Sequence, residues 1–184
     1  MIRTLPGLDA VLENARPALA GDFHAYRGHA YRVANYCLFL AEGAAANPAT
    51  RAEDLEKISL AAAFHDLGIW TARTFDYLDP SRESLSAWLM RSGKTAWLPE
   101  IAAMVGMHHK ITPYQGAHAR LAEAFRKADA IDLTFGALAL GVPRAFIREA
   151  NAGFPEKGFR RLILRLALGR LREHPLDPLP MFRL

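Results

Sequence analysis

Prolines and glycines divide this chain of 184 residues into stretches in which apolar residues recur every three or four positions. That spacing predicts amphipathic helices, and the abundance of alanine and leucine favours helix over strand. No alternating, β-branched run bounded by turn residues indicates a strand. Start and stop signals place the predicted helices at about 23–43, 51–67, 81–92, 99–109, 116–134, 143–151 and 155–173. The sequence therefore predicts an all-α fold, a single compact domain of about seven or eight helices.

No internal repeat, low-complexity run or linker divides the chain, and its length suits one domain with a substantial core. Residues 44–50 are predicted to form a loop. The proline-rich tail HPLDPLPMFRL, at 174–184, is predicted to run extended along the surface. One domain spanning 1–184 is therefore expected.

Composition limits the setting of the protein. The chain is 51% apolar and 23% charged, which is typical of globular proteins. No apolar stretch approaches the roughly 18–20 residues of a membrane span, and the N-terminal residues lack the apolar segment of a signal peptide. The single cysteine, Cys37, cannot form an internal disulfide and is expected to be a small buried hydrophobe. These features predict a cytoplasmic protein that is not associated with a membrane.

The balance of charges indicates a type of ligand. The formal net charge of +4 mildly favours an anionic one. The basic residues are spread out except in the predicted helix 155–173, where they are typical of a solvated helix face. Nucleic-acid binding is therefore not expected.

A histidine and an aspartate, His65 and Asp66, stand side by side at the end of the apolar run LAAAFHDLG. Burying an unpaired carboxylate costs several kcal/mol or shifts its protonation. The spacing of apolar neighbours puts His29 and Asp129 on the inward faces of two other predicted helices. Four side chains able to bind a metal, from three helices, are therefore predicted to face one core.

A divalent metal would resolve this burial, because it neutralises carboxylates and accepts imidazole nitrogen. Two histidines and two aspartates suit Mn, Fe, Co, Ni or Zn, with positions left for water. Water bound to such an ion loses a proton near neutral pH and becomes a nucleophile. His29, His65, Asp66 and Asp129 are the predicted ligands, and Asp132 is an alternative to Asp129 or an outer neighbour of it.

The order H…HD…D, with ADAID downstream, resembles the HD-domain metal-dependent phosphohydrolases over about residues 22–135. The resemblance implies an all-α fold, a metal at these four residues and phosphoester hydrolysis. It also favours Asp129 over Asp132, since the family pattern has the aspartate after a Lys/Arg-Ala pair, here Lys127-Ala128.

His108 and His109 form a second pair, in MVGMHHKITPY. In some HD proteins extra histidines here bind a second metal or the substrate phosphate, and we expect one or both in the active site. The alternative is that they are surface histidines at a helix C-terminus. No other histidine lies between His65 and His108, and no GYP motif is found, so a complete second metal site is not expected.

Basic side chains near these motifs are candidates for binding a phosphate. They are Arg32, Lys110 and Lys127. The segment IWTARTFDYLDPS follows the HD pair and is expected to form a wall or lid, with Trp70, Arg73, Asp76 and Tyr77 as candidate contacts. The acid pair that guanosine-tetraphosphate hydrolases carry shortly after HD is missing, which disfavours that activity.

The leading hypothesis is a phosphohydrolase acting on a small anionic phosphorylated substrate. In it Asp66 orients or deprotonates the attacking water, and His108 or His109 stabilises the phosphoryl charge or protonates the leaving oxygen. The alternatives are an HD-type di-iron oxygenase or hydratase/lyase, or a helical regulatory module with a structural metal. Residues 136–184 lie outside the motif, and they complete the fold, cover the site or form a homodimer surface.

Overall fold

The computed structural model describes residues 1–42 and 48–182; within them all regular secondary structure is helical and no strand occurs, which confirms the predicted all-α fold. Eight helices have nine or more residues, and two have four. The helices are α1 (Pro6–Asn14), α2 (Arg16–Leu19), α3 (Phe23–Glu42), α4 (Pro48–Phe64), α5 (Gly68–Thr71), α6 (Leu78–Arg91), α7 (Leu98–Met107), α8 (Ala119–Leu133), α9 (Arg144–Gly153) and α10 (Phe159–Glu173). Short 3-10 turns occur at Ala20–Asp22, Thr95–Trp97 and Pro180–Phe182.

The boundaries differ from the predictions mainly at the N-terminal ends of elements. The short helices α1 and α2 were not predicted, although Pro6 stands in the first turn of α1, where proline is favoured, and Leu8 and Leu12 are buried. α4 begins at Pro48, inside the predicted loop; residues 44–47 of that loop lie outside the described part of the chain. α4 also ends at Phe64, so that the HD pair follows the helix instead of belonging to it.

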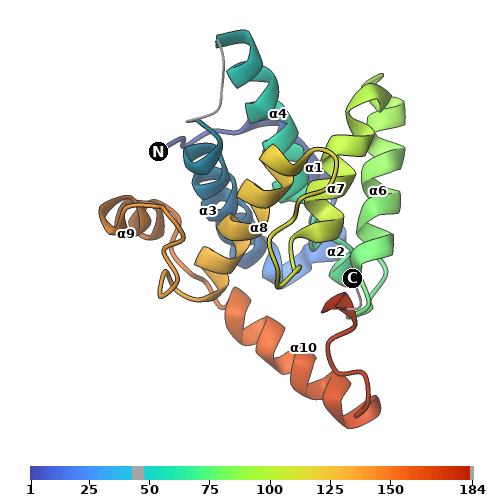
Figure 1. Ribbon diagram of the computed structural model, residues 1–184. Coiled ribbons are helices and arrows are strands. Elements are labelled where there is room, and N and C mark those ends of the chain that lie inside the picture. Colours follow the sequence, from blue (N-terminus) through green and yellow to red (C-terminus); the bar gives the residue numbers. More distant parts are fainter. Residues whose placement is uncertain (43–47, 183–184) are drawn as a thin grey trace.

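The core is built around α3, which packs against α4 and α8 and is nearly surrounded by other elements. Figure 1 shows α3, α8 and α7 side by side, with α4 behind them. The end of α4 approaches α3 closely because Ala61, Ala62 and Ala63 are small, and all three are buried. This packing brings His29 in α3, the HD pair after α4 and Asp129 in α8 to one junction.

The HD pair continues into a turn held by a close backbone approach. A Cβ atom at Gly68 would lie 2.4 Å from the carbonyl oxygen of Tyr77, so only glycine fits there. The Gly68 amide donates to the Ser81 hydroxyl at 2.9 Å. Gly68 was predicted to end the preceding helix, but α4 ends at Phe64 and Gly68 is the first residue of α5. Its close backbone contact places Tyr77 near the HD pair.

The C-terminal part leaves the core and returns to it. α10 crosses the lower edge of the molecule in Figure 1, and the tail after it turns back towards the α5–α6 segment. The tail was predicted to be extended along the surface, but Pro180 and Met181 are buried and form a 3-10 turn with Phe182. Met181 packs in a small cluster with Ile69 and Tyr77.

None of the helices in residues 1–42 and 48–182 has the combination of length and apolar character that crossing a bilayer requires.

Candidate metal centre

The four predicted metal ligands meet in one buried cluster. His29 Nε2 lies 2.9 Å from His65 Nε2, 3.6 Å from Asp66 Oδ2 and 3.5 Å from Asp129 Oδ1. His65 Nε2 lies 3.3 Å from Asp66 Oδ2. The side chains of both histidines are fully buried, and those of the aspartates are 5% or less exposed. The three helical segments therefore bring together the residues that the sequence pattern selected.

The backbone around the HD pair is fixed by α3. The Tyr26 hydroxyl donates to the carbonyl oxygen of Ala63 at 3.0 Å and accepts from the Asp66 amide at 3.2 Å. The His65 amide still donates to the Ala61 carbonyl, as in a helix. The turn that presents His65 and Asp66 is thus held by one buried tyrosine.

The second histidine pair reaches the same cluster. His108 Nε2 lies 3.4 Å from Asp66 Oδ1, and His109 Nδ1 lies 3.8 Å from Asp129 Oδ2. Asp66, His108 and His109 form a second group whose ligand atoms are close enough to hold an ion, beside the group of His29, His65 and Asp66. The alternative that they are surface histidines is therefore wrong: α7 ends at Met107, and both histidines after it turn inward.

Two of the four histidines are oriented by backbone carbonyls of their own segment. His65 Nδ1 lies 2.9 Å from the Ala62 carbonyl oxygen, and His108 Nδ1 lies 2.7 Å from that of Val105. Since a carbonyl oxygen can only accept, each Nδ1 carries a proton, and the neutral form of each ring presents an Nε2 lone pair to the cluster. Converging lone pairs in a buried site call for a cation or a donor.

The other two histidines are oriented by side chains distant in the sequence. His29 Nδ1 lies 2.7 Å from Asp132 Oδ2, and His109 Nε2 lies 2.6 Å from the Tyr77 hydroxyl. In both, the remaining ring nitrogen faces the aspartates of the cluster. Every histidine of the cluster thus has one nitrogen bound outside it and one directed into it, the usual arrangement of metal-binding histidines.

The cluster also contains two buried polar atoms without a hydrogen-bond partner among the described residues. They are Asp66 Oδ1 and His108 Nε2. Leaving such an atom unsatisfied costs about 1–3 kcal/mol, and more when it is charged. Both atoms belong to the second group, and a divalent cation bound between them would satisfy both. The donor set therefore fits a metal ion.

The two carboxylates differ in protonation when no cation is present. Burial, together with the charges of Asp66 and Asp132, raises the pKa of Asp129 to about 8. Burial also opposes ionisation of Asp66, but the charges and hydrogen-bonding capacity of His65 and His108 hold its pKa well below the usual value. Two buried carboxylates in one site cannot both ionise cheaply, and a cation removes that conflict.

Asp132 lies outside the ligand cluster and contacts His29, so of its two predicted positions it takes the outer one. Arg32 donates to it through Nε at 2.6 Å and Nη2 at 2.9 Å, and Arg160 donates to its side chain at 3.2 Å and to its carbonyl at 2.9 Å. Burial alone would raise the pKa of Asp132, but the hydrogen bonds from His29 and Arg32 hold it well below its usual value. On the other side, the Phe159 ring stacks on His29 with centroids 4.0 Å apart.

The three basic residues that were predicted to bind a substrate phosphate lie in different surroundings. Arg32 is fully buried and also donates to the Phe154 carbonyl at 2.8 Å, so it supports Asp132 in the interior and is not available at the surface. Lys110 lies beside His109 at a hollow of about 140 Å³. Lys127 is partly exposed on α8, with its amine 3.7 Å from Glu123.

The segment after the HD pair, which was predicted to form a wall or lid, lies only partly beside the cluster. Tyr77 is buried against His109, and burial and the charges of Asp66 and Asp129 raise the pKa of Tyr77 well above its usual value. Arg73 is exposed and lines a separate cavity of about 360 Å³ with Trp70, whose indole donates to Asp22.

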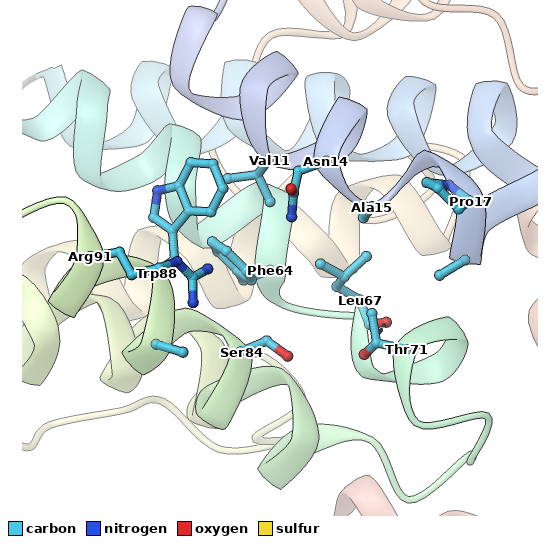
Figure 2. A pocket seen from close by; sticks show the side chains of 12 residues that line it. Val11, Asn14, Ala15, Pro17, Phe64, Leu67, Thr71, Ser84, Trp88 and Arg91 are labelled. Carbon is cyan, nitrogen blue, oxygen red and sulfur yellow. Dashed lines mark hydrogen bonds between the residues drawn. The ribbon is translucent and has the colours of Figure 1, made fainter.

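A further cavity of about 350 Å³ lies on the other side of the HD segment. Figure 2 shows that Phe64 and Leu67, the chain neighbours of the HD pair, line it together with Trp88 and Val11. None of the cluster's ligand side chains lines it. It is therefore distinct from the candidate metal centre.

Comparison with protein-family models, with curated proteins and with solved structures found no match to this chain. The fold and the cluster themselves define a helical protein with a buried His/Asp group that could hold a metal ion, an arrangement compatible with an HD-like site.

Proposed function

We propose that this protein is a metal-dependent phosphohydrolase of the HD-domain type, with His29, His65, Asp66 and Asp129 as ligands of a divalent transition-metal ion. One observation carries the proposal: in one buried site, the Nε2 atoms of His29 and His65 face Asp66 Oδ2, and that of His108 faces Asp66 Oδ1, which has no hydrogen-bond partner among the described residues. The order of the four residues along the chain, H…HD…D, supports the HD type in particular.

The residues around the cluster have complementary roles in this proposal. A divalent ion, when bound, supplies Lewis-acid polarisation of a phosphoryl oxygen and an activated water. Asp66 remains a carboxylate because its pKa is low, so its free Oδ1 can accept a hydrogen bond from the attacking water and orient it. His109, with a side chain 11% exposed, is the most accessible group of the cluster. Burial lowers its pKa well below the usual value, so the neutral ring can stabilise the phosphoryl charge by a hydrogen bond but does not supply a proton to the leaving oxygen.

The surroundings of His109 favour an anionic substrate. Lys110 lines the hollow beside it, and its amine can act as a point charge for a phosphate. Ile111, Thr112 and Phe182 complete this hollow. The combination of one cation, one hydroxyl and apolar side chains suits a small phosphorylated molecule.

A second candidate is an HD-type oxygenase with two iron ions. It is favoured by one observation, namely that two overlapping ligand groups share Asp66. A carboxylate shared between two groups can bridge two ions. Two iron ions per chain, with no turnover of any phosphoester, would support this candidate over the phosphohydrolase.

The test is hydrolysis of a generic aryl phosphate monoester and a diester by the purified full chain loaded in turn with Mn²⁺, Fe²⁺, Co²⁺, Ni²⁺ and Zn²⁺. We expect turnover that is lost in Asp66→Asn, with helical content retained. Asp79→Asn is the matched control, because its side chain is 85% exposed and lies outside the cluster. Equal turnover in the wild type and Asp66→Asn, or no turnover with any metal, would contradict the proposal.

A further inference from the structure

The candidate centre is closed on most sides. The side chains of His29, His65 and His108 are fully buried, and those of Asp66 and Asp129 are 5% and 3% exposed. His109 is the most exposed side chain of this cluster, at 11%, and it lines a solvent-accessible hollow beside Lys110. A ligand from solution is therefore expected to approach along the His109 side.

The C-terminal tail lies at this approach. The Phe182 ring is 5.5 Å from the His109 ring and lines the same hollow as Lys110. Its neighbour Met181 is only 3% exposed, because it packs in the cluster that contains Tyr77. Tyr77 in turn is hydrogen-bonded to His109, so the tail contacts both the histidine and the residue that orients it.

The return of the tail is fixed by its own contacts. Arg170, in the last turn of α10, donates to the Asp177 side chain at 2.9 Å and to its carbonyl at 3.3 Å. Prolines at 175, 178 and 180 restrict the backbone and lower the entropy lost on ordering it. Met181 anchors the segment in the interior, whereas Phe182 is 44% exposed and covers the hollow.

We propose that Phe182, held in place by the buried Met181, forms the outer wall of the entrance to the metal centre and determines which substrates reach it. The assignment rests on the proposed function, since it concerns access to the same centre. The wall selects phosphorylated substrates whose second substituent is small enough to pass between Phe182 and Lys110. Bulky diesters are disfavoured because they would have to displace the Phe182 ring from the entrance.

Two readouts on Phe182→Ala test this, one of which does not depend on activity. The first is the rate at which a colorimetric chelator withdraws Zn²⁺ from the loaded full chain. The second is the ratio of kcat/KM for a bis-aryl phosphodiester to that for a methyl aryl phosphodiester with the same leaving group. Leu176→Ala is the matched control, because Leu176 lies in the same tail and is 99% exposed.

We expect Phe182→Ala to release Zn²⁺ several-fold faster and to shift the ratio several-fold towards the bulky diester. Zn²⁺ bound per chain should stay unchanged, and Leu176→Ala should match the wild type. Unchanged Zn²⁺ release and an unchanged kcat/KM ratio, both in Phe182→Ala and in the double variant with Met181→Ala, would contradict the proposed wall. Hydrolysis by the wild type would still support the proposed function. Faster Zn²⁺ release without turnover of any phosphoester would support the wall as a barrier to access and would contradict the proposed function.

Discussion

The four histidines of the cluster fall into two pairs that are held in different ways. His65 and His108 each bind a carbonyl oxygen three residues earlier in the chain. His29 and His109 depend on side chains that are 103 and 32 residues away, Asp132 and Tyr77. The first pair needs only a local turn of backbone, whereas the second needs the tertiary fold.

This difference determines which histidines can be reoriented by changing a neighbouring side chain. A carbonyl oxygen stays in place when its side chain is changed, so the orientation of His65 and His108 resists substitution. The orientation of His29 and His109 does not, because their partners are side chains. The remote pair is therefore the part of the centre whose metal affinity can be tuned from outside the cluster.

Among changes outside the ligand set, the largest effect is expected from Asp132→Asn, which removes the charge that orients His29. Loss of such an outer partner lowers metal affinity about 10–100-fold. Because Arg32 and Arg160 lose their carboxylate, the free energy of unfolding should also fall, by up to about 3–5 kcal/mol. Metal titration and chemical denaturation measure the two effects.

Asp79→Asn serves as the control for Asp132→Asn, since it makes the same chemical change on an exposed side chain. Retention of wild-type metal affinity in Asp132→Asn would remove the distinction between the remote and the local pair.

The next effect in size concerns pH and Asp129, which faces both histidines of the remote pair. Its pKa in the metal-free protein is about 8, and only the ionised carboxylate binds a cation. Protons therefore compete with the metal below that pH. Apparent affinity for Mn²⁺ should rise by about tenfold per pH unit from about pH 6 and level off above about pH 8.

Titration of the full chain with Mn²⁺ at several pH values measures this slope. Asp129→Asn should bind Mn²⁺ more weakly and lose most of the slope. An affinity that is constant across this range in the wild type would contradict the raised pKa of Asp129.

A smaller loss is expected from Tyr77→Phe, which removes the hydroxyl bound to His109 but keeps the buried ring. We expect affinity for an ion held by the second group, Asp66, His108 and His109, to fall by about tenfold, at the low end for an outer partner. The matched control is Tyr114→Phe, since the Tyr114 hydroxyl donates to the Ala117 carbonyl in an exposed loop, outside the cluster. A change equal to that of the control would show that His109 does not depend on Tyr77.

No change in metal affinity is expected from Val105→Ala, because the carbonyl that binds His108 remains. Removing two buried methyl groups should still lower the free energy of unfolding by about 2 kcal/mol. Denaturation and metal titration of the same variant separate the two quantities. A tenfold loss of affinity here would mean that the local pair also depends on packing of its side-chain neighbours.

Much of the inner cluster could be predicted from helical periodicity. His29 and Asp129 were assigned to inward faces, and both are buried. His108 and His109 were expected to approach the interior, and both do. What periodicity cannot give is the conformation after a helix ends, and this is why the sequence left open whether His108 and His109 lie in the site or at the surface.

The outer partners could not be predicted because they join distant parts of the chain. Arg32 was assigned to the substrate, yet it lies 100 residues from its partner Asp132. Its place one turn after His29 was a usable signal, since a neighbour on an inward face is expected to be buried. No local pattern connects Phe159 or Arg160 to His29, and the sequence left open whether the segment that contains α10 completes the fold, covers the site or forms a dimer surface.

The central claim is that the buried His/Asp cluster is a metal centre, and elemental analysis of the purified full chain tests it most directly. The protein would be loaded separately with Mn²⁺, Fe²⁺, Co²⁺, Ni²⁺ and Zn²⁺, desalted and compared with Asp66→Asn, which alters the residue shared by both ligand groups. We predict about one or two ions per chain for at least one of these metals, lost in Asp66→Asn with the helical content retained. No stoichiometric ion with any of the five metals would contradict the claim.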